Sequence, residues 1–333
     1  MDFKTSSRIG LVNFLALVLL ALSAGADQAW SQTKTHLSIA TGLKGGVYYP
    51  VGAGLAKLIS RHLPDVDAKA VETTGSINNV QLLHSGKVAL ALTGPDTAWY
   101  AYQGHLKGIN DKMAIRTLLA LYSNYMHIVT LDGSGIKSVA DLRGKRLSTG
   151  APGSGTEVKG TRVMEAYGVT TKDLKSQARL GVSESARALK DRQIDAFLWD
   201  GGLPTSAVEK LAATPGIKIR LLPHGDAVEK MVAKYGPFYF VGNIPRGIYK
   251  SVDDDVLVAV VTNLLVAQEN MDEKLAYEIT RLFLEHTPEL AAMHSAAAEV
   301  TLKSAAAGSP IPFHPGALRY FKGRGVDLPV LSR

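Results

Sequence analysis

One segment near the amino terminus limits the possible folds more than any other part of the sequence. An apolar stretch at residues 37–40 leads through a glycine-rich turn at 41–46 into a segment whose apolar residues recur at helical spacing. Such a turn exposes backbone N–H groups at the positive end of a helix, where anions bind. After Gly54 the chain continues with leucine, so the glycine spacing of a dinucleotide site is missing. The segment therefore predicts an α/β fold and a small anionic ligand.

Strand-like and helix-like segments alternate along most of the chain, which is typical of α/β proteins with mainly parallel sheets. After about residue 250 the pattern predicts mostly helix, and a capping box at Ser251-Val-Asp-Asp254 predicts a helix start. Lobe crossings are expected near Ser123 and Pro223, which gives residues 32–124 and 225–333 as one lobe and residues 125–224 as the other. The predicted strands are residues 37–41, 67–72, 88–93, 116–122, 126–131, 146–149, 195–199 and 217–222.

The first residues predict export. Lys4 and Arg8 precede an apolar run at residues 9–22, and small residues follow, as in a secretory signal peptide. The run is shorter than the ~20 residues of a bilayer span. We therefore expect residues 1–31 to be removed and the remaining chain to be periplasmic without a membrane span, with a membrane anchor as the alternative.

Composition argues against several functional classes. The chain has no cysteine, which excludes disulfides, thiolate catalysis and cysteine zinc sites. Its net charge is +7, but the basic residues are scattered, so no nucleic-acid partner is expected. The nine histidines show no close metal-ligand spacing, so neither a metal nor another cofactor is expected.

Enzyme motifs are also missing. Residues 150–157 imitate a phosphate loop, but Thr156 and Glu157 stand where lysine and a hydroxyl residue are needed. No serine lies in a Gly-x-Ser-x-Gly motif. We therefore expect a binding protein, and an enzyme on the same fold is the weaker alternative.

Three more glycine turns follow predicted strands and open predicted helices, at residues 72–79, 93–96 and 150–157. Ligands in open α/β sheets bind at the carboxyl ends of strands, where such turns meet. The four turns together predict one ligand site.

The ordered motifs resemble the TAXI subfamily of TRAP-transporter solute receptors. They include Thr-Gly-x-x-Gly-Gly-Val-Tyr-Tyr-Pro at 41–50, Thr-Gly-Ser-x-x-Asn at 74–79, Gly-Ala-Pro-Gly-Ser-Gly-Thr-Glu at 150–157 and Gly-Leu-Pro-Thr at 202–205. The resemblance implies the type II periplasmic binding-protein fold, in which two α/β lobes close on a solute in the cleft between them. It also implies delivery of a small carboxylate, such as glutamate, a dicarboxylate or a 2-oxo acid, to an ion-coupled TRAP membrane permease.

By motif position, the resemblance implies solute contacts from three turns: Gly45, Gly46, Val47 and Tyr48 in the first, Thr74, Ser76 and Asn79 in the second, and Ser154, Gly155 and Thr156 in the other lobe.

Three further residues allow two interpretations each. Asp200 stands where relatives commonly have apolar residues: it either meets the solute, by receiving an ammonium or repelling a second carboxylate, or caps a helix near Pro204. Trp199 either packs in the core or lines the site. Asp96 either complements the dipole of its own helix or contacts the solute. A sensor that presents solute to a membrane kinase needs the same cleft, and the sequence leaves that alternative open.

Overall fold

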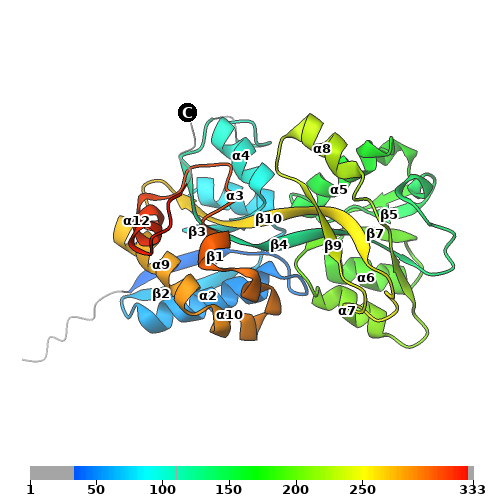
Figure 1. Ribbon diagram of the computed structural model, residues 1–333. Coiled ribbons are helices and arrows are strands. Elements are labelled where there is room, and N and C mark those ends of the chain that lie inside the picture. The colour runs from blue at the N-terminus through cyan, green and yellow to red at the C-terminus, as the bar shows by residue number, and fades with distance from the viewer. Residues whose placement is uncertain (1–33, 110, 329–333) are drawn as a thin grey trace, which may run out of the picture. The chain divides into compact units, whose positions relative to one another are not determined.

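The structure is a computed structural model that describes residues 34–109 and 111–328. From His36 onward the described chain belongs to one compact unit (Figure 1). The predicted signal peptide lies outside the described residues.

The strands alternate with helices as far as β8 and confirm the predicted α/β class. The strands are β1 (Thr35–Ala40), β2 (Val66–Val71), β3 (Leu90–Thr93), β4 (Ile115–Leu131), β5 (Arg146–Ser148), β6 (Ser176–Ala178), β7 (Ala196–Gly201), β8 (Ile219–Leu221), β9 (Phe240–Ile244) and β10 (Val256–Gln268). The α-helices are α2 (Tyr48–His62), α3 (Ser76–His84), α4 (Pro95–Gln103), α5 (Gly155–Ala166), α6 (Val182–Lys190), α7 (Ser206–Ala213), α8 (Ala227–Tyr235), α9 (Glu273–Glu285), α10 (Thr287–Met293), α11 (Leu302–Ala305) and α12 (Pro315–Gly323). Short 3₁₀ helices are η1 (Val139–Leu142), η2 (Thr171–Asp173) and η3 (Ser295–Glu299).

All described strands join one sheet in the order β2-β1-β3-β10-β4-β7-β5-β6, with β8 beside β4 and β9 beside β10. The order repeats itself, because β1 lies between β2 and β3 just as β5 lies between β6 and β7. The β1–β3, β5–β6 and β5–β7 pairs are parallel. The long strands β4 and β10 run antiparallel between the two groups (Figure 1).

Helices cover both faces of the sheet at each end. At the β1–β3 end, which we call the first half, α2, α9 and α12 pack on one face and α3 and α4 on the other. At the β5–β7 end, the second half, α6 and α7 pack on one face and α5 and α8 on the other. β10 alternates accordingly: Val258 and Val260 enter one cluster of the second half, and Ala259 and Val261 enter the other. The inner strands of the sheet are therefore largely buried on both faces.

β10 corrects the expectation of helix after residue 250. Its sequence, Val-Leu-Val-Ala-Val-Val-Thr-Asn-Leu-Leu-Val-Ala-Gln, is rich in β-branched residues and is buried on both sides, as in an inner strand. A continuous apolar run has no alternation to mark it as a strand, which is why periodicity failed. Ser251, expected to cap a helix, instead stands in a turn with φ of 68°.

The predicted lobe boundaries stay a prediction. The first predicted crossing falls inside β4, which is one continuous strand where two were expected. Residues 227–261 pack with the second half, so the packing favours β10, not the strand that ends before Pro223, as the other connection between the halves.

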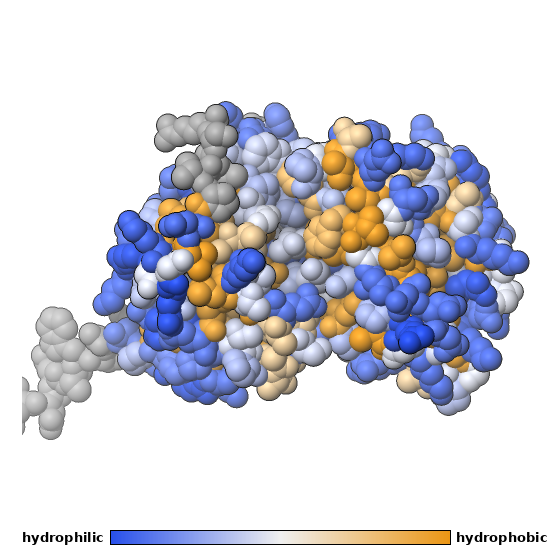
Figure 2. All heavy atoms as spheres, viewed as in Figure 1, coloured by the Kyte–Doolittle hydropathy of each residue, from blue (hydrophilic) through white to orange (hydrophobic). Residues whose placement is uncertain are grey.

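Large exposed hydrophobic side chains occur at Phe240, Val241 and Leu257, on β9 and the adjoining end of β10. Figure 2 shows hydrophobic side chains gathered in this region of the visible face. None of the helices in the described ranges has the length and apolar character needed to cross a bilayer.

Candidate functional site

A narrow hollow of ≈ 30 Å³ lies where the two halves meet at the carboxyl ends of their strands. That space holds only a few water molecules in this arrangement of the halves. Nine of the twelve residues proposed from the sequence line it: Gly46, Val47, Tyr48, Thr74, Ser76, Ser154, Gly155, Thr156 and Asp200.

Three helices begin at the hollow. The first residues of α2, α3 and α5 are Tyr48, Ser76 and Gly155, and all three line it. Their unpaired backbone N–H groups and aligned peptide dipoles make the hollow favourable for negative charge. None of the described residues that line it is lysine, arginine or histidine. The attraction for an anion therefore comes from the backbone and from hydroxyl groups.

Three hydroxyl residues that line the hollow each accept a backbone N–H. Ser154 Oγ accepts the N–H of Glu157 at 3.1 Å, Ser76 Oγ accepts that of Gly94 at 3.2 Å, and Thr156 Oγ1 accepts that of Asp200 at 3.1 Å. A hydroxyl that accepts a backbone N–H keeps its own proton for another acceptor. Both halves thus offer O–H donors to one solute.

The floor of the hollow is a chain of hydrogen bonds across β10, β4 and β7. The Tyr48 hydroxyl donates to Asn263 Oδ1 at 2.6 Å, and Asn263 Nδ2 donates to Asn124 Oδ1 at 2.8 Å. Asn124 Nδ2 then donates to Asp200 Oδ2 at 3.2 Å. Burial, and then the nearby charge of Asp200, raise the pKa of Tyr48, so its hydroxyl stays protonated and keeps donating.

Asp200 is paired with Lys159, which the sequence analysis missed. Lys159 Nζ lies 2.5 Å from Asp200 Oδ1, and the two side chains are only 2% and 6% exposed. The pair cancels the charge of the one acidic residue that lines the hollow. Asp200 does not cap α7, which begins at Ser206 after Thr205. The alternative in which it meets the solute stays open.

The halves also touch each other around the hollow. Asn78 N donates to Gly153 O, and Ala207 N donates to Gly45 O, both at 3.2 Å. A Cβ added at Gly46 would lie 2.8 Å from the Trp199 ring. Trp199 lines the hollow and donates its indole N–H to Thr205 Oγ1 at 2.8 Å, so it serves both roles considered for it.

Three residues proposed from the sequence do not line the hollow. Asn79 is fully buried and donates to Thr41 O at 2.5 Å and Leu92 O at 2.7 Å, so its amide holds neighbouring strands together. Gly45 faces Ser183 and Ala207 in the contact between the halves. Asp96, the third, forms an ion pair instead.

Asp96 and Arg162 join α4 to α5 across the two halves. Their Oδ2 and guanidinium nitrogen are 2.5 Å apart, and the side chains are 6% and 11% exposed. Tyr239 donates its hydroxyl to the same carboxylate oxygen at 2.9 Å. Burial alone lowers the pKa of Arg162, but the charge of Asp96 and the contact with Tyr239 outweigh it, and the pKa lies above its usual value. Asp96 also accepts the N–H of Thr97 at the start of its own helix.

Other lining residues escaped the sequence analysis: Gly42, Leu43, Gly75, Asn124 and Gly201. Asn124 had a visible signal, because it is a polar residue inside a long apolar strand. Lys159 had one as well, since it stands three residues after Thr156 and so shares its helix face.

A larger hollow of ≈ 780 Å³ lies along β8 and residues 250–256. Its lining mixes Asp132, Asp253 and Asp254 with Arg192, Arg220 and Lys250, and no described helix begins there. It lacks the convergence of donors found in the small hollow, which is therefore the better candidate.

The NMT1-like family matches residues 39–325. The chain belongs to the NMT1-like family. Among solved structures, a protein from Bordetella bronchiseptica RB50 is similar, with 18% identity, a TM-score of 0.53, and coverage of 87% of this chain and 89% of that one. The periplasmic aliphatic sulphonate binding protein SsuA from Escherichia coli has 17% identity, a TM-score of 0.49, and coverage of 86% and 83%. A binding protein component of an ABC phosphonate transporter from Pseudomonas aeruginosa has 12% identity, a TM-score of 0.49, and coverage of 79% of both chains.

At these identities the likeness to solved structures concerns the fold alone. The predicted mixed α/β fold class is confirmed, and the Bordetella bronchiseptica protein shares this fold.

Proposed function

We propose that this chain is an extracytoplasmic receptor that binds a small carboxylate in the hollow between its halves and delivers it to an ion-coupled TRAP permease. The observation that carries the proposal is the set of three hydroxyl donors and three helix N-termini that meet in one hollow. Hydrogen bonds to a charged acceptor are about twice as strong as neutral ones, so such donors can hold an anion without arginine.

The solute classes that we favour are acidic amino acids, glutamate among them, dicarboxylates and 2-oxo acids, as the TAXI resemblance implies. The permease partner rests on that resemblance alone, and the periplasmic location also on the predicted signal peptide.

Asp200 suggests how the site distinguishes a solute that carries an ammonium group from one that carries a second carboxylate. Each of its oxygens accepts one hydrogen bond, from Lys159 or Asn124, and has capacity for another. A solute ammonium can therefore donate to Asp200, whereas a second carboxylate placed there has no hydrogen to donate. Glutamate and 2-oxoglutarate form a matched pair that tests this, because they share a carbon skeleton and differ in the amino group.

The test is a thermal-shift screen of the chain after unfolding and refolding have released any copurified solute. A bound solute raises stability by about 2.7 kcal/mol at a hundredfold excess over its Kd. We expect shifts with carboxylates and none with their amides. Shifts with sulfonates or phosphonates alone would contradict the carboxylate assignment.

Two measurements separate the alternatives. Chromatography of each hit after incubation should recover the compound unchanged, whereas turnover supports an enzyme. Uptake of labelled solute by membrane vesicles should require both the receptor and an ion gradient. Uptake driven by ATP hydrolysis, or a receptor that triggers only kinase phosphorylation, would contradict the permease assignment.

A further inference from the structure

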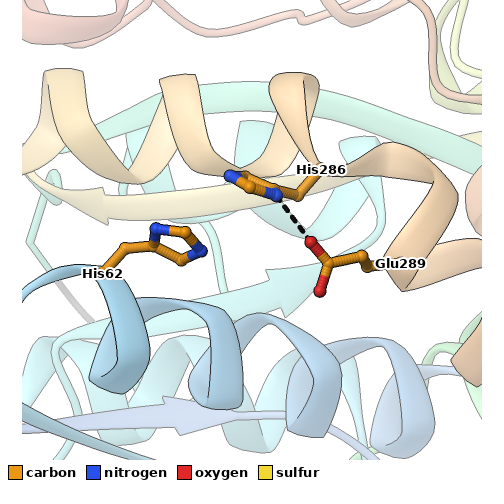
Figure 3. A group of neighbouring side chains, drawn as sticks. All are labelled: His62, His286 and Glu289. Carbon is orange, nitrogen blue, oxygen red and sulfur yellow. Dashed lines mark hydrogen bonds and ion pairs between the residues drawn. The ribbon is translucent and has the colours of Figure 1, made fainter.

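Three metal-ligating side chains lie together on the first half, outside the hollow. His62 ends α2, His286 lies between α9 and α10, and Glu289 stands in the first turn of α10. One ligand atom of each lies within 4.8 Å of the corresponding atoms of the other two. Figure 3 shows His286 and Glu289 facing each other, with the ring of His62 across the gap between the helices.

The contacts within this cluster already converge on a positive group. The guanidinium of Arg61 donates to Glu289 Oε2, and Arg61 Nε donates to His62 Nε2 at 3.2 Å. His286 Nδ1 lies 2.7 Å from Glu289 Oε1, and the two imidazole rings have centroids 4.4 Å apart. His62 and Glu289 therefore already bind the Arg61 cation through an imidazole lone pair and a carboxylate. The imidazole of His286 lies beside them.

We propose that His62, His286 and Glu289 form a binding site for a divalent transition metal ion, of which zinc is the type. Two imidazoles and one carboxylate are a ligand set that zinc and copper accept. Ligand atoms of tetrahedral zinc lie about 3.4 Å apart, given bonds of about 2.0 to 2.1 Å. The ligand atoms here lie within 4.8 Å of one another, so the exposed side chains of His62 and Glu289 must rotate to reach that spacing. The ion takes the place of the proton between His286 Nδ1 and Glu289, and the neutral imidazole carries its ring proton on Nε2 instead.

Some groups around the three ligands favour metal binding, and others oppose it. A hollow of ≈ 60 Å³ between α2 and α10 borders Arg61 and Glu289, which gives room for water as a further ligand. His62 Nε2 already accepts a hydrogen bond from Arg61 Nε, so this nitrogen offers a lone pair. Arg61 and Lys57 repel a metal ion, and the Arg61 side chain must turn toward solvent when one binds.

This site is independent of the proposed solute. Because the ligands come from α2 and from the junction of α9 and α10, a bound ion links two segments far apart in the sequence. That separation also explains why the sequence shows no close histidine spacing of the kind that indicates a metal site. Since the ligand set forms only in the folded chain, binding raises thermal stability.

The experiment is titration of a tag-free chain with Zn²⁺ in competition with a chromophoric chelator. We expect one equivalent to bind with a micromolar Kd, and His62→Ala and His286→Ala each to weaken binding at least tenfold. His84→Ala removes an exposed histidine at the end of another helix and should bind like the parent chain. Arg61→Gln should bind zinc severalfold more tightly, because the competing cation is gone.

Thermal melts of each variant without metal report whether it folds. If an alanine variant does not fold, Arg61→Gln still tests the site, because it keeps all three ligands. A parent chain that binds no Zn²⁺ at 100 µM overturns the proposal. So does binding that survives both histidine substitutions.

Discussion

At the scale of single residues, the arrangement around the hollow depends on charge neutrality. Lys159 is nearly fully buried against Asp200, and a buried charge left without its partner is strongly unfavourable. If one partner of the pair is removed, the sign of the charge that remains decides whether an anionic solute binds more tightly or more weakly.

Lys159→Met should therefore weaken solute binding at least tenfold, because it leaves an unpaired carboxylate beside an anion. The double substitution Lys159→Met with Asp200→Asn removes both charges and should restore most of the affinity. Calorimetry of the two variants, with urea unfolding as a check on folding, measures the effect. Equal affinity in the single and double variants would show that Asp200 does not face the solute.

Gly155 is needed for close approach of the halves. A Cβ added there would lie 2.9 Å from Ser76 Oγ, across the hollow in the other half. Gly155→Ala should lower solute affinity without lowering the stability of the solute-free chain, because alanine favours helix. Gly323→Ala, in α12 with no atom within 4 Å of the added Cβ, is the matched control. A thermal melt and a titration of both variants decide it, and unchanged affinity in Gly155→Ala contradicts the close approach.

Residue types alone predicted much of the hollow, because turns rich in glycine and hydroxyl residues recur where several strands lead into helices. They could not predict Lys159 or Asn124, whose roles come from partners on other strands. They also misassigned Asn79, because an amide at the start of a helix is suited equally to a solute and to neighbouring backbone, and only packing decides.

At the scale of elements, the ion pair between Asp96 of α4 and Arg162 of α5 joins the two halves. Arg162 also lies 4.4 Å from the centroid of the Tyr235 ring, so it is held by aromatic contacts as well. Asp96→Asn should cost about 3 to 5 kcal/mol of unfolding free energy, the usual result of breaking a buried pair. Asp96→Leu combined with Arg162→Leu should cost less than the single change, because no charge is left buried. Urea unfolding of both variants tests this, and a loss below 1 kcal/mol in Asp96→Asn contradicts a structural ion pair.

The central strands predict a dependence of stability on pH. His127 in β4 and His224 after β8 are buried, and burial lowers the pKa of each to about 4. In the unfolded chain the same rings take up protons below about pH 6.5. The unfolded state therefore binds more protons between these values, and stability present above pH 6.5 is lost as the pH falls toward 4.

His127 accepts the Tyr249 hydroxyl through Nε2 at 2.9 Å and lies 2.8 Å from Tyr125 O through Nδ1, which fixes the neutral form. Between pH 7.5 and 5 this residue should account for on the order of 2 kcal/mol of lost stability. His127→Gln should reduce the pH dependence by that amount, as measured by urea unfolding at both pH values. An unchanged pH dependence contradicts the buried neutral ring.

Helices were predicted well where the spacing of apolar residues and the residue types of the preceding turn agreed, as for α2 and α5. β10 failed because a strand buried on both faces has the same apolar run as a buried helix. β9 was missed because half-exposed residues and a glycine interrupt its pattern.

At the scale of the whole molecule, β4 and β10 run through both halves, and the hollow lies beside that connection. We propose that both halves bind the same anion, which stabilises their contact because the solute interacts better with the halves together than apart.

The most direct test is calorimetry of one carboxylate hit on Ser76→Ala, from the first half, and Thr156→Ala, from the second. Each change should cost about 1.5 to 3 kcal/mol of binding, the range for hydrogen bonds to charged groups. Ser85→Ala, at the exposed far end of the same helix as Ser76, should bind like the parent chain. Weakened binding in both hollow variants supports a solute held by the two halves together. Parent-like affinity in both would mean that the solute binds elsewhere and that the glycine turns are scaffold.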